Sequence, residues 1–255
     1  MAGSSSIEWT EMTWNPVTGC TKVSQGCKNC YAERMAKRLQ AMGVPQYRNG
    51  FKPALAPQVM EEPYKWKKPR VVFVNSMSDL FHESVPLDYI KRVFKVMNET
   101  PHAFQVLTKR SARLAEISEK LTWTENIWMG VSVESEAVTF RVDDLRASAA
   151  RRRFLSIEPL IGPIHTLDLA EIDWIIVGGE SGPRARPIMK DWIEDIQGRC
   201  HAAGVPFFFK QWGKASFNDD PSDPTQTKGH ADYAKGGCQL DGAVYRALPV
   251  VAEAP

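Results

Sequence analysis

Residues 71–79 read VVFVNSMSD, and this stretch decides the predicted fold class. Val71–Val74 is continuously apolar, whereas Asn75–Asp79 is mostly polar. A strand with apolar side chains on both faces is typical of a parallel sheet that helices cover on each side. Trp174–Val177 has the same apolar pattern and is followed by the more polar stretch Gly178–Ser181. The sequence therefore predicts an α/β protein with buried parallel strands.

Strand and helix patterns alternate along most of the chain. Short β-branched and aromatic runs predict strands at Ile7–Trp14, Arg70–Asn75, Ala103–Thr108, Ile127–Val133, Arg153–Ile157, Asp173–Val177 and Val205–Lys210. Amphipathic stretches predict helices at Cys30–Met42, Leu87–Glu99, Ser111–Glu119, Glu136–Ala147 and Lys190–Ala203. The repeat of about thirty residues is the size expected of a βαβ unit.

Polar residues that follow the strands favour a barrel over an open sheet. A Rossmann domain carries a G-x-G-x-x-G motif after its first strand, and this sequence has no such motif there. Polar clusters instead follow nearly every strand, and parallel strands bring such clusters to one face, as in a β/α barrel. We therefore predict a partial or irregular TIM-type (β/α) barrel over residues 1–212. The Pro-rich insertion Gly43–Pro69 is expected to form a lid or a short strand pair, and residues 213–255 a partly flexible C-terminal tail.

Composition excludes several classes of protein. The 255 residues are 43% hydrophobic and 24% charged, which is the globular average and excludes a mainly disordered chain. The net charge of +2 is too small to indicate a protein that coats nucleic acid. Met1–Ser6 lacks the basic and apolar regions of a secretory signal, and no apolar run approaches the roughly 18 residues of a membrane span. We expect a soluble, cytoplasmic protein without a membrane partner.

Three of the five cysteines lie within eleven residues of one another. Cys20, Cys27 and Cys30 form C-x6-C-x2-C between the first predicted strand and the first predicted helix, whereas Cys200 and Cys238 stand alone. Clustered thiols of this kind indicate metal binding or redox chemistry rather than a disulfide framework. A structural zinc site requires four ligands, and a thioredoxin-like dithiol uses only the C-x2-C pair. A [4Fe–4S] cluster with one open iron uses all three thiolates.

The cysteine loop resembles that of the radical S-adenosylmethionine superfamily, in particular its photoproduct-lyase-like branch. The resemblance lies in Asn15-Pro16-x2-Gly19-Cys20 and in Gly26-Cys27-x2-Cys30 followed by Tyr31. The first spacing differs, because six residues separate Cys20 from Cys27 where most members have three. Asn29 occupies a position that is usually aromatic.

A second resemblance, to a family known as phage proteins, covers most of the chain. It is carried by Thr13–Pro16, Met77–Phe81, Leu107–Arg110, Ser156–Leu160, Gly178–Gly182 and Phe209–Gly213. Members of that family are sometimes paired with a separate three-cysteine-motif protein, which makes such a protein an expected partner.

The superfamily resemblance implies a function and its cofactors. Cys20, Cys27 and Cys30 are expected to hold a [4Fe–4S] cluster whose open iron binds S-adenosylmethionine (SAM). An electron donor of the flavodoxin or ferredoxin type is then expected to drive reductive cleavage of SAM to a 5′-deoxyadenosyl radical.

The resemblance also implies residues that bind SAM. Superfamily members hold the methionyl amine with a Gly-Gly-Glu stretch after the second strand, and here Ser76, Ser78 and Asp79 occupy that place, although Asp79 fits a helix N-cap equally well. Tyr31 is expected to pack against the adenine or in the core. Residues after later strands are further candidates for the cofactor site: Gly178, Gly179, Glu180 and Lys210, together with Glu134 and Glu158, whose carboxylates suit ribose hydroxyls or the substrate.

The substrate is indicated only by cations that follow strand ends. Lys109, Arg110, Arg184, Arg186 and Lys210 are placed to meet phosphates, which favours a nucleic acid or nucleotide that is modified or repaired. Candidate catalytic residues are Lys109, Glu158 and Cys238, the last as a hydrogen donor. The alternative function is a zinc-stabilised, non-catalytic nucleic-acid-binding or phage partner protein.

Overall fold

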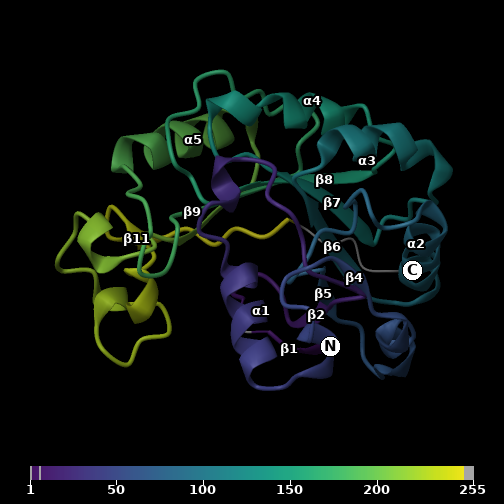
Figure 1. The fold of residues 1–255 in the computed structure, drawn as a ribbon. Helices are drawn as coiled ribbons and strands as arrows, with labels where there is room; N and C mark the ends of the chain where they lie inside the picture. The colour runs from purple at the N-terminus through teal and green to yellow at the C-terminus, as the bar shows by residue number, and fades with distance from the viewer. Residues whose placement is uncertain (1, 6, 250–255) are drawn as a thin grey trace. The chain divides into compact units, whose positions relative to one another are not determined.

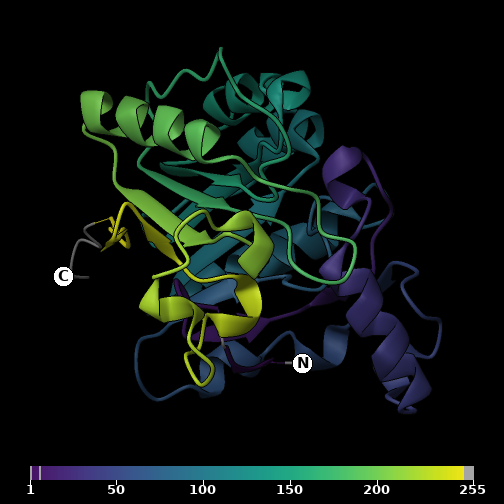
Figure 2. The same ribbon diagram turned by 90° about the vertical axis from the view of Figure 1, so that its left-hand side faces the viewer.

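The computed structural model describes residues 2–5 and 7–249 (Figures 1 and 2). These residues divide into two compact units. The first unit comprises residues 2–131 and 143–153, and the second comprises residues 132–142 and 154–249. Strands alternate with helices in both units, which confirms the predicted fold class of α/β, partial (β/α)-barrel type.

The first unit is built on a mainly parallel sheet in the order β1-β2-β5-β6-β7. Its strands are β1 (Ala2–Ser4), β2 (Met12–Trp14), β5 (Val71–Val74), β6 (Ala103–Thr108) and β7 (Ile127–Ser132). Only β1 is antiparallel to its neighbour; the pairs β2–β5, β5–β6 and β6–β7 are parallel. The parallel strands therefore end at one edge, where their following loops lie close together.

Three helices accompany these strands: α1 (Tyr31–Ala41), α2 (Leu87–Glu99) and α3 (Ser111–Ile117). In α2 the buried residues Ile90, Val93, Phe94 and Met97 recur at helical spacing, and Phe94 meets Trp123 edge to face. Burial of each of these side chains stabilises the fold by roughly 2 kcal/mol. The helix is thus held by one apolar stripe.

The second unit contains three parallel strands and a long helix. The strands are β8 (Arg152–Ile157), β9 (Trp174–Gly178) and β10 (Phe207–Gln211), and the helix is α5 (Lys190–Ala203). Helix α5 ends at Gly204, whose φ of 66° is readily adopted only by glycine. A final hairpin joins β11 (Gln239–Leu240) to β12 (Ala243–Val244).

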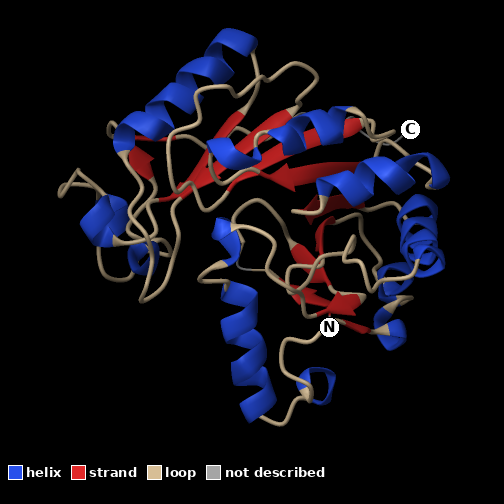
Figure 3. Cartoon of the chain, turned by 45° about the horizontal axis from the view of Figure 1, so that its top comes forward, coloured by secondary structure: helices blue, strands red, loops and turns tan. Residues whose placement is uncertain are grey.

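The insertion and the connections contain shorter elements (Figure 3). The strand β3 (Val17–Thr18) pairs with β4 (Ala54–Leu55), so the Pro-rich insertion contributes one strand of a short pair whose other strand precedes the insertion. Helix α4 spans Phe140–Arg146. Short 3-10 helices lie at Gln25–Cys27, Pro45–Tyr47, Pro57–Val59, Glu62–Lys65, Ser118–Lys120, Glu136–Val138, Ala215–Phe217, Pro224–Gln226 and Tyr233–Lys235.

Three predicted elements differ from those observed, one of them because the helix predicted over Ser111–Glu119 ends at Ile117 and continues as the 3-10 turn Ser118–Lys120. The first strand begins at Met12 rather than Ile7, because a turn closed by the Thr10 amide and the Ile7 carbonyl precedes it. The helix predicted over Glu136–Ala147 is divided into a 3-10 turn and α4. In the described part of the chain, no helix has the length and apolar character needed to cross a membrane.

Candidate functional site

The first cysteine is held between two other segments of the first unit. The Gly19 amide donates to the Met77 carbonyl at 3.2 Å, and the Cys20 amide donates to the Phe51 carbonyl at 3.1 Å. Gly19 has a φ of 75°, and a Cβ there would collide with the Lys52 carbonyl. Only glycine fits this position, so Gly19 is a structural requirement for the placement of Cys20.

The loop that follows β5 lies directly against the cysteine loop. The side-chain oxygen of Asn15 accepts from Ser76 Oγ at 3.2 Å and from the Met77 amide at 3.1 Å. Ser78 Oγ donates to the Val17 carbonyl at 2.7 Å. The structure therefore places the segment Ser76–Ser78, which the sequence proposes for SAM, against the residues just before Cys20.

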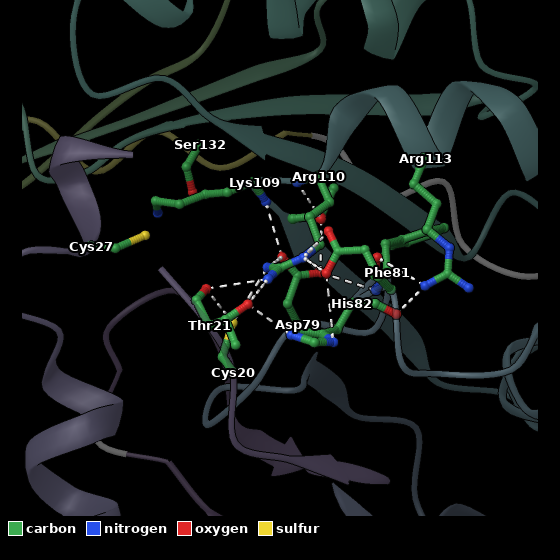
Figure 4. Close-up of polar contacts among 12 residues, drawn as sticks. Cys20, Thr21, Cys27, Asp79, Phe81, His82, Lys109, Arg110, Arg113 and Ser132 are labelled. Carbon is green, nitrogen blue, oxygen red and sulfur yellow. Dashed lines mark hydrogen bonds and ion pairs between the residues drawn. The ribbon is translucent and has the colours of Figure 1, made fainter. Parts of the chain in front are cut away.

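A buried arginine joins these two loops (Figure 4). The Arg110 side chain is only 4% exposed and donates from Nη1 to Cys20 Sγ at 3.3 Å and to Asp79 Oδ2 at 3.1 Å. Its Nη2 donates to the Thr21 carbonyl at 3.2 Å and to Thr21 Oγ1 at 2.8 Å. Its Nε contacts both Glu83 oxygens, at 2.9 and 3.0 Å. One guanidinium thus fixes the first cysteine and the residue after it.

Asp79 is held by several donors besides Arg110. Its Oδ1 accepts from Thr108 Oγ1 at 2.8 Å and from the Phe81 amide at 3.0 Å, and its Oδ2 accepts from the Lys109 amide at 3.2 Å. Asp79 is not a helix N-cap, because α2 begins at Leu87 with Pro86 before it. The carboxylate instead ties the end of β6 to the loop after β5.

The groups around Cys20 shift the pKa of its thiol in opposite directions. Burial raises the pKa of the Cys20 thiol to about 11, Asp79 adds to the rise, and Arg110 opposes it through its charge and its hydrogen bond. Burial alone would lower the pKa of Arg110, but Asp79, Cys20 and Glu83 more than offset this, so its pKa is raised. Arg110 therefore remains a cation beside Cys20, where it favours the thiolate.

The other two cysteines belong to the start of α1. Cys27 closes the 3-10 turn Gln25–Cys27, and its Sγ lies 3.9 Å from Ser24 Oγ. Cys30 is the N-cap of α1, so the positive end of the helix is directed at the loop. Tyr31 follows with 56% of its surface exposed, so it is not a core residue.

The donor types are those that hold an iron–sulfur cluster. Cys20, Cys27 and Cys30 are free thiols, partly exposed, on one loop of one unit. Within residues 2–5 and 7–249, no three His, Cys, Asp or Glu side chains converge on a position for a single metal ion. The thiolates of a cubane bind separate irons and do not need to converge on one point.

The second unit has its own polar cluster at strand ends. Lys210 Nζ lies 3.2 Å from Glu158 Oε1, and both side chains are about four-fifths buried. A Cβ on Gly178 would lie 2.5 Å from the same Glu158 oxygen, and a Cβ on Gly179 would collide with the Trp212 carbonyl. These two glycines therefore leave room for a side chain and for backbone, respectively.

The two remaining predicted carboxylates of the second unit are paired. Glu180 binds Arg186 through both oxygens, with the shortest contact at 2.7 Å. Glu134 is fully buried and lies 2.8 Å from Arg141 Nη1. Two such ion pairs hold the loops that follow β9 and β7.

The candidate catalytic residues lie in different settings. Lys109 is half-buried after β6. Cys238 is buried, and burial raises the pKa of its thiol to about 11. Cys200 is likewise buried in α5, where burial raises its pKa to about 12, as expected of a core residue. The sequence did not show the link from Arg110 to Cys20, since the two are 90 residues apart.

A protein-family model described as "Protein of unknown function (DUF5131)" matches residues 4–249. The chain belongs to this family. No curated protein matches the DUF5131 chain.

Solved structures of spore photoproduct lyase are similar to the DUF5131 chain. A variant with bound AdoMet and dinucleoside spore photoproduct is 12% identical with a TM-score of 0.46, and covers 70% of this chain and 58% of the lyase chain. Another variant, with dinucleoside spore photoproduct, is 12% identical with a TM-score of 0.49, covering 78% and 63%. A lyase complex with the same dinucleoside is 13% identical with a TM-score of 0.47. The DUF5131 chain thus spans about three fifths of the lyase chains.

Proposed function

We propose that the chain is a radical SAM enzyme that carries a [4Fe–4S] cluster on Cys20, Cys27 and Cys30. The observation that supports this most is the set of three free thiols on one loop, of which the first accepts a hydrogen bond from a buried guanidinium. The resemblance of the loop to that of the radical SAM superfamily supplies the identity of the cluster. When bound, the cluster supplies the electron that cleaves SAM to a 5′-deoxyadenosyl radical.

The residues around the loop act by holding and orienting it. Arg110 keeps Cys20 in place and offsets negative charge near its sulfur, while Asp79 and Glu83 hold the guanidinium. Both carboxylate oxygens of Asp79 already accept hydrogen bonds from donors of the protein, so Asp79 is proposed as a positioning residue. Ser76, Ser78 and the exposed Tyr31 are then the first-unit candidates for contact with SAM.

Second-unit residues are proposed for hydroxyl groups of SAM or of the substrate. Glu158 and Lys210 form an ion pair that leaves further donor and acceptor capacity at strand ends. Gly178 and Gly179 permit close approach of neighbouring atoms there. Glu134 and Glu180, which form ion pairs with Arg141 and Arg186, are proposed for the same hydroxyl groups.

The proposed substrate is a nucleic acid or nucleotide, with Lys109 and Cys238 as catalytic candidates. A flavodoxin- or ferredoxin-type protein is the proposed electron donor. A role in phage biology with a three-cysteine-motif partner protein, in the cytoplasm, completes the proposal.

Anaerobic reconstitution with iron and sulfide tests the proposal. The wild-type chain should bind about four irons and show charge-transfer absorption, and reduction with SAM should release 5′-deoxyadenosine. Cys27→Ala should lose the cluster, whereas Cys200→Ala, at a buried thiol outside the loop, should keep it. One tightly bound zinc per chain, or full iron content in Cys27→Ala, would contradict the ligand assignment and favour a non-catalytic zinc protein.

A further inference from the structure

Positive charge is concentrated in the part of the chain that contains the cysteine loop. Residues 12–60 hold seven Lys and Arg but only one acidic residue, Glu33. The whole chain has 32 basic and 30 acidic residues, so the rest has 25 basic and 29 acidic residues. All seven cations are exposed: Lys22, Lys28, Arg34, Lys37, Arg38, Arg48 and Lys52. A segment with a net charge of +6 thus lies in a chain that is otherwise acidic.

Packing of α1 directs several of these cations to one side. Ala36 is fully buried, and Met35 and Leu39 pack with it against Tyr47 and Met77. The helix stands out from the strands of its own unit (Figures 2 and 3). Arg34, Lys37 and Arg38 therefore form an exposed stripe at helical spacing opposite the apolar contacts.

The one carboxylate of the same segment, Glu33, is shared between two of its seven cations. Glu33 lies 3.2 Å from Lys22 and 2.8 Å from Lys37, and both lysines are more than half exposed. Exposed pairs of this kind contribute little to stability. With one carboxylate and seven cations, the segment carries a net charge of +6, and a surface on which one sign of charge dominates attracts a polyanion.

We propose that the exposed side of α1 and its flanking turns binds the phosphate backbone of a single-stranded nucleic acid. Apolar side chains among the cations favour this partner over an acidic protein: Tyr31 is 56% exposed and Met42 is 66% exposed. Tyr31, Arg34 and Arg38 follow one another along the helix at intervals of three and four residues. An aromatic ring followed by two guanidinium groups on one helix face provides a surface on which bases stack while the cations contact phosphates.

This proposal names the surface that receives the substrate. It rests on the proposed function only in that the bound nucleic acid is taken to be the substrate of the enzyme. The binding itself requires neither a cluster nor SAM. A failure to bind nucleic acid is therefore distinguishable from a failure to cleave SAM, because the two are measured on separate samples.

Fluorescence anisotropy with a labelled single-stranded DNA oligonucleotide of mixed sequence tests the surface. The full chain is used as purified, and the dissociation constant is measured between about 50 and 200 mM salt. If four cations contact phosphates, the slope of log K against log salt is about −2.8, and affinity falls roughly 50-fold over this range. Arg34→Glu with Arg38→Glu should reduce the slope by about 1.4 and weaken binding at low salt.

The control is a charge-matched variant on the same unit. Lys67→Glu with Lys68→Glu changes two exposed lysines outside the segment by the same total charge and should keep the wild-type slope. Equal binding by the Arg34/Arg38 variant and this control would overturn the proposal. Poly-glutamate that competes as well as the oligonucleotide would overturn the choice of partner and favour an acidic protein. Unchanged melting temperatures in both variants would show that the chain remains folded.

Discussion

Replacement of Arg110 by methionine is expected to destabilise the chain by about 3 kcal/mol. Methionine keeps an unbranched side chain of similar length but removes the contacts to Cys20, Asp79 and Thr21. Loss of one partner from a buried ion pair costs about 3–5 kcal/mol, because the other charge stays buried and unpaired. Asp79 is 7% exposed and keeps three other donors, so the lower end of the range applies.

The Glu83 contact adds little to this estimate. The Glu83 side chain is 64% exposed, so solvent screens its pairing with Arg110. Glu83→Gln should therefore cost less than about 1 kcal/mol. The comparison separates the buried side of the guanidinium from its exposed side.

Differential scanning fluorimetry on the cofactor-free chain provides the measurement. For a chain of this size, 3 kcal/mol corresponds to a fall in melting temperature of roughly 6–12 °C. Combined with Asp79→Asn, Arg110→Met should cost less than the sum of the single changes, by about 1–3 kcal/mol. If Arg110→Met melts no lower than Glu83→Gln, the buried network does not stabilise this loop and the reasoning fails.

Two further outcomes concern glycines and pH. Gly178→Ala should destabilise the fold by about 1–3 kcal/mol, because the new Cβ displaces Glu158 from Lys210. Gly198→Ala should stabilise the fold by about 0.5–1 kcal/mol, because Gly198 lies within α5 and an added Cβ there meets no other atom. Thermal melts of both variants check these values. His82 Nδ1 accepts from the Ser84 amide, and burial and Arg110 lower the His82 pKa. The unfolded chain therefore binds the proton more readily, so stability should fall as pH drops below about 6.5 towards the lower folded pKa. His82→Gln should flatten this part of the curve of unfolding free energy against pH, and an unchanged curve would contradict the assignment.

Local signals were sufficient for much of the fold. The bounds of α2, α5 and β6 agree with the predicted ranges Leu87–Glu99, Lys190–Ala203 and Ala103–Thr108. Each has a strong apolar period or a clear end signal, so the pattern is readable without tertiary information. The strand β1 was not predicted, because its sequence, AGS, has no β-branched or aromatic residue and forms only by pairing with β2.

The sequence allowed the candidate residues to be chosen, but it did not show the network of contacts that joins them. The three cysteines and the loop Ser76–Asp79 were recognised from spacing and position. That Arg110 joins them was not, because a buried arginine among several that follow strands has no distinguishing local pattern. Asp79 illustrates the same limit: its sequence fits a cap or a cofactor ligand, and only its contacts with Thr108 and Arg110 show what it holds.

The two ends of the cysteine loop belong to different parts of the first unit. Gly19 and Cys20 are tied to the insertion and to the loop after β5, whereas Cys27 and Cys30 move with α1. Residues 21–26 join these two attachments and add contacts of their own, because Arg110 binds Thr21 and the 3-10 turn Gln25–Cys27 includes the last of them. Separate supports therefore place the first and the later sulfur atoms. The number of residues between Cys20 and Cys27 is then a poor guide to where their sulfur atoms lie.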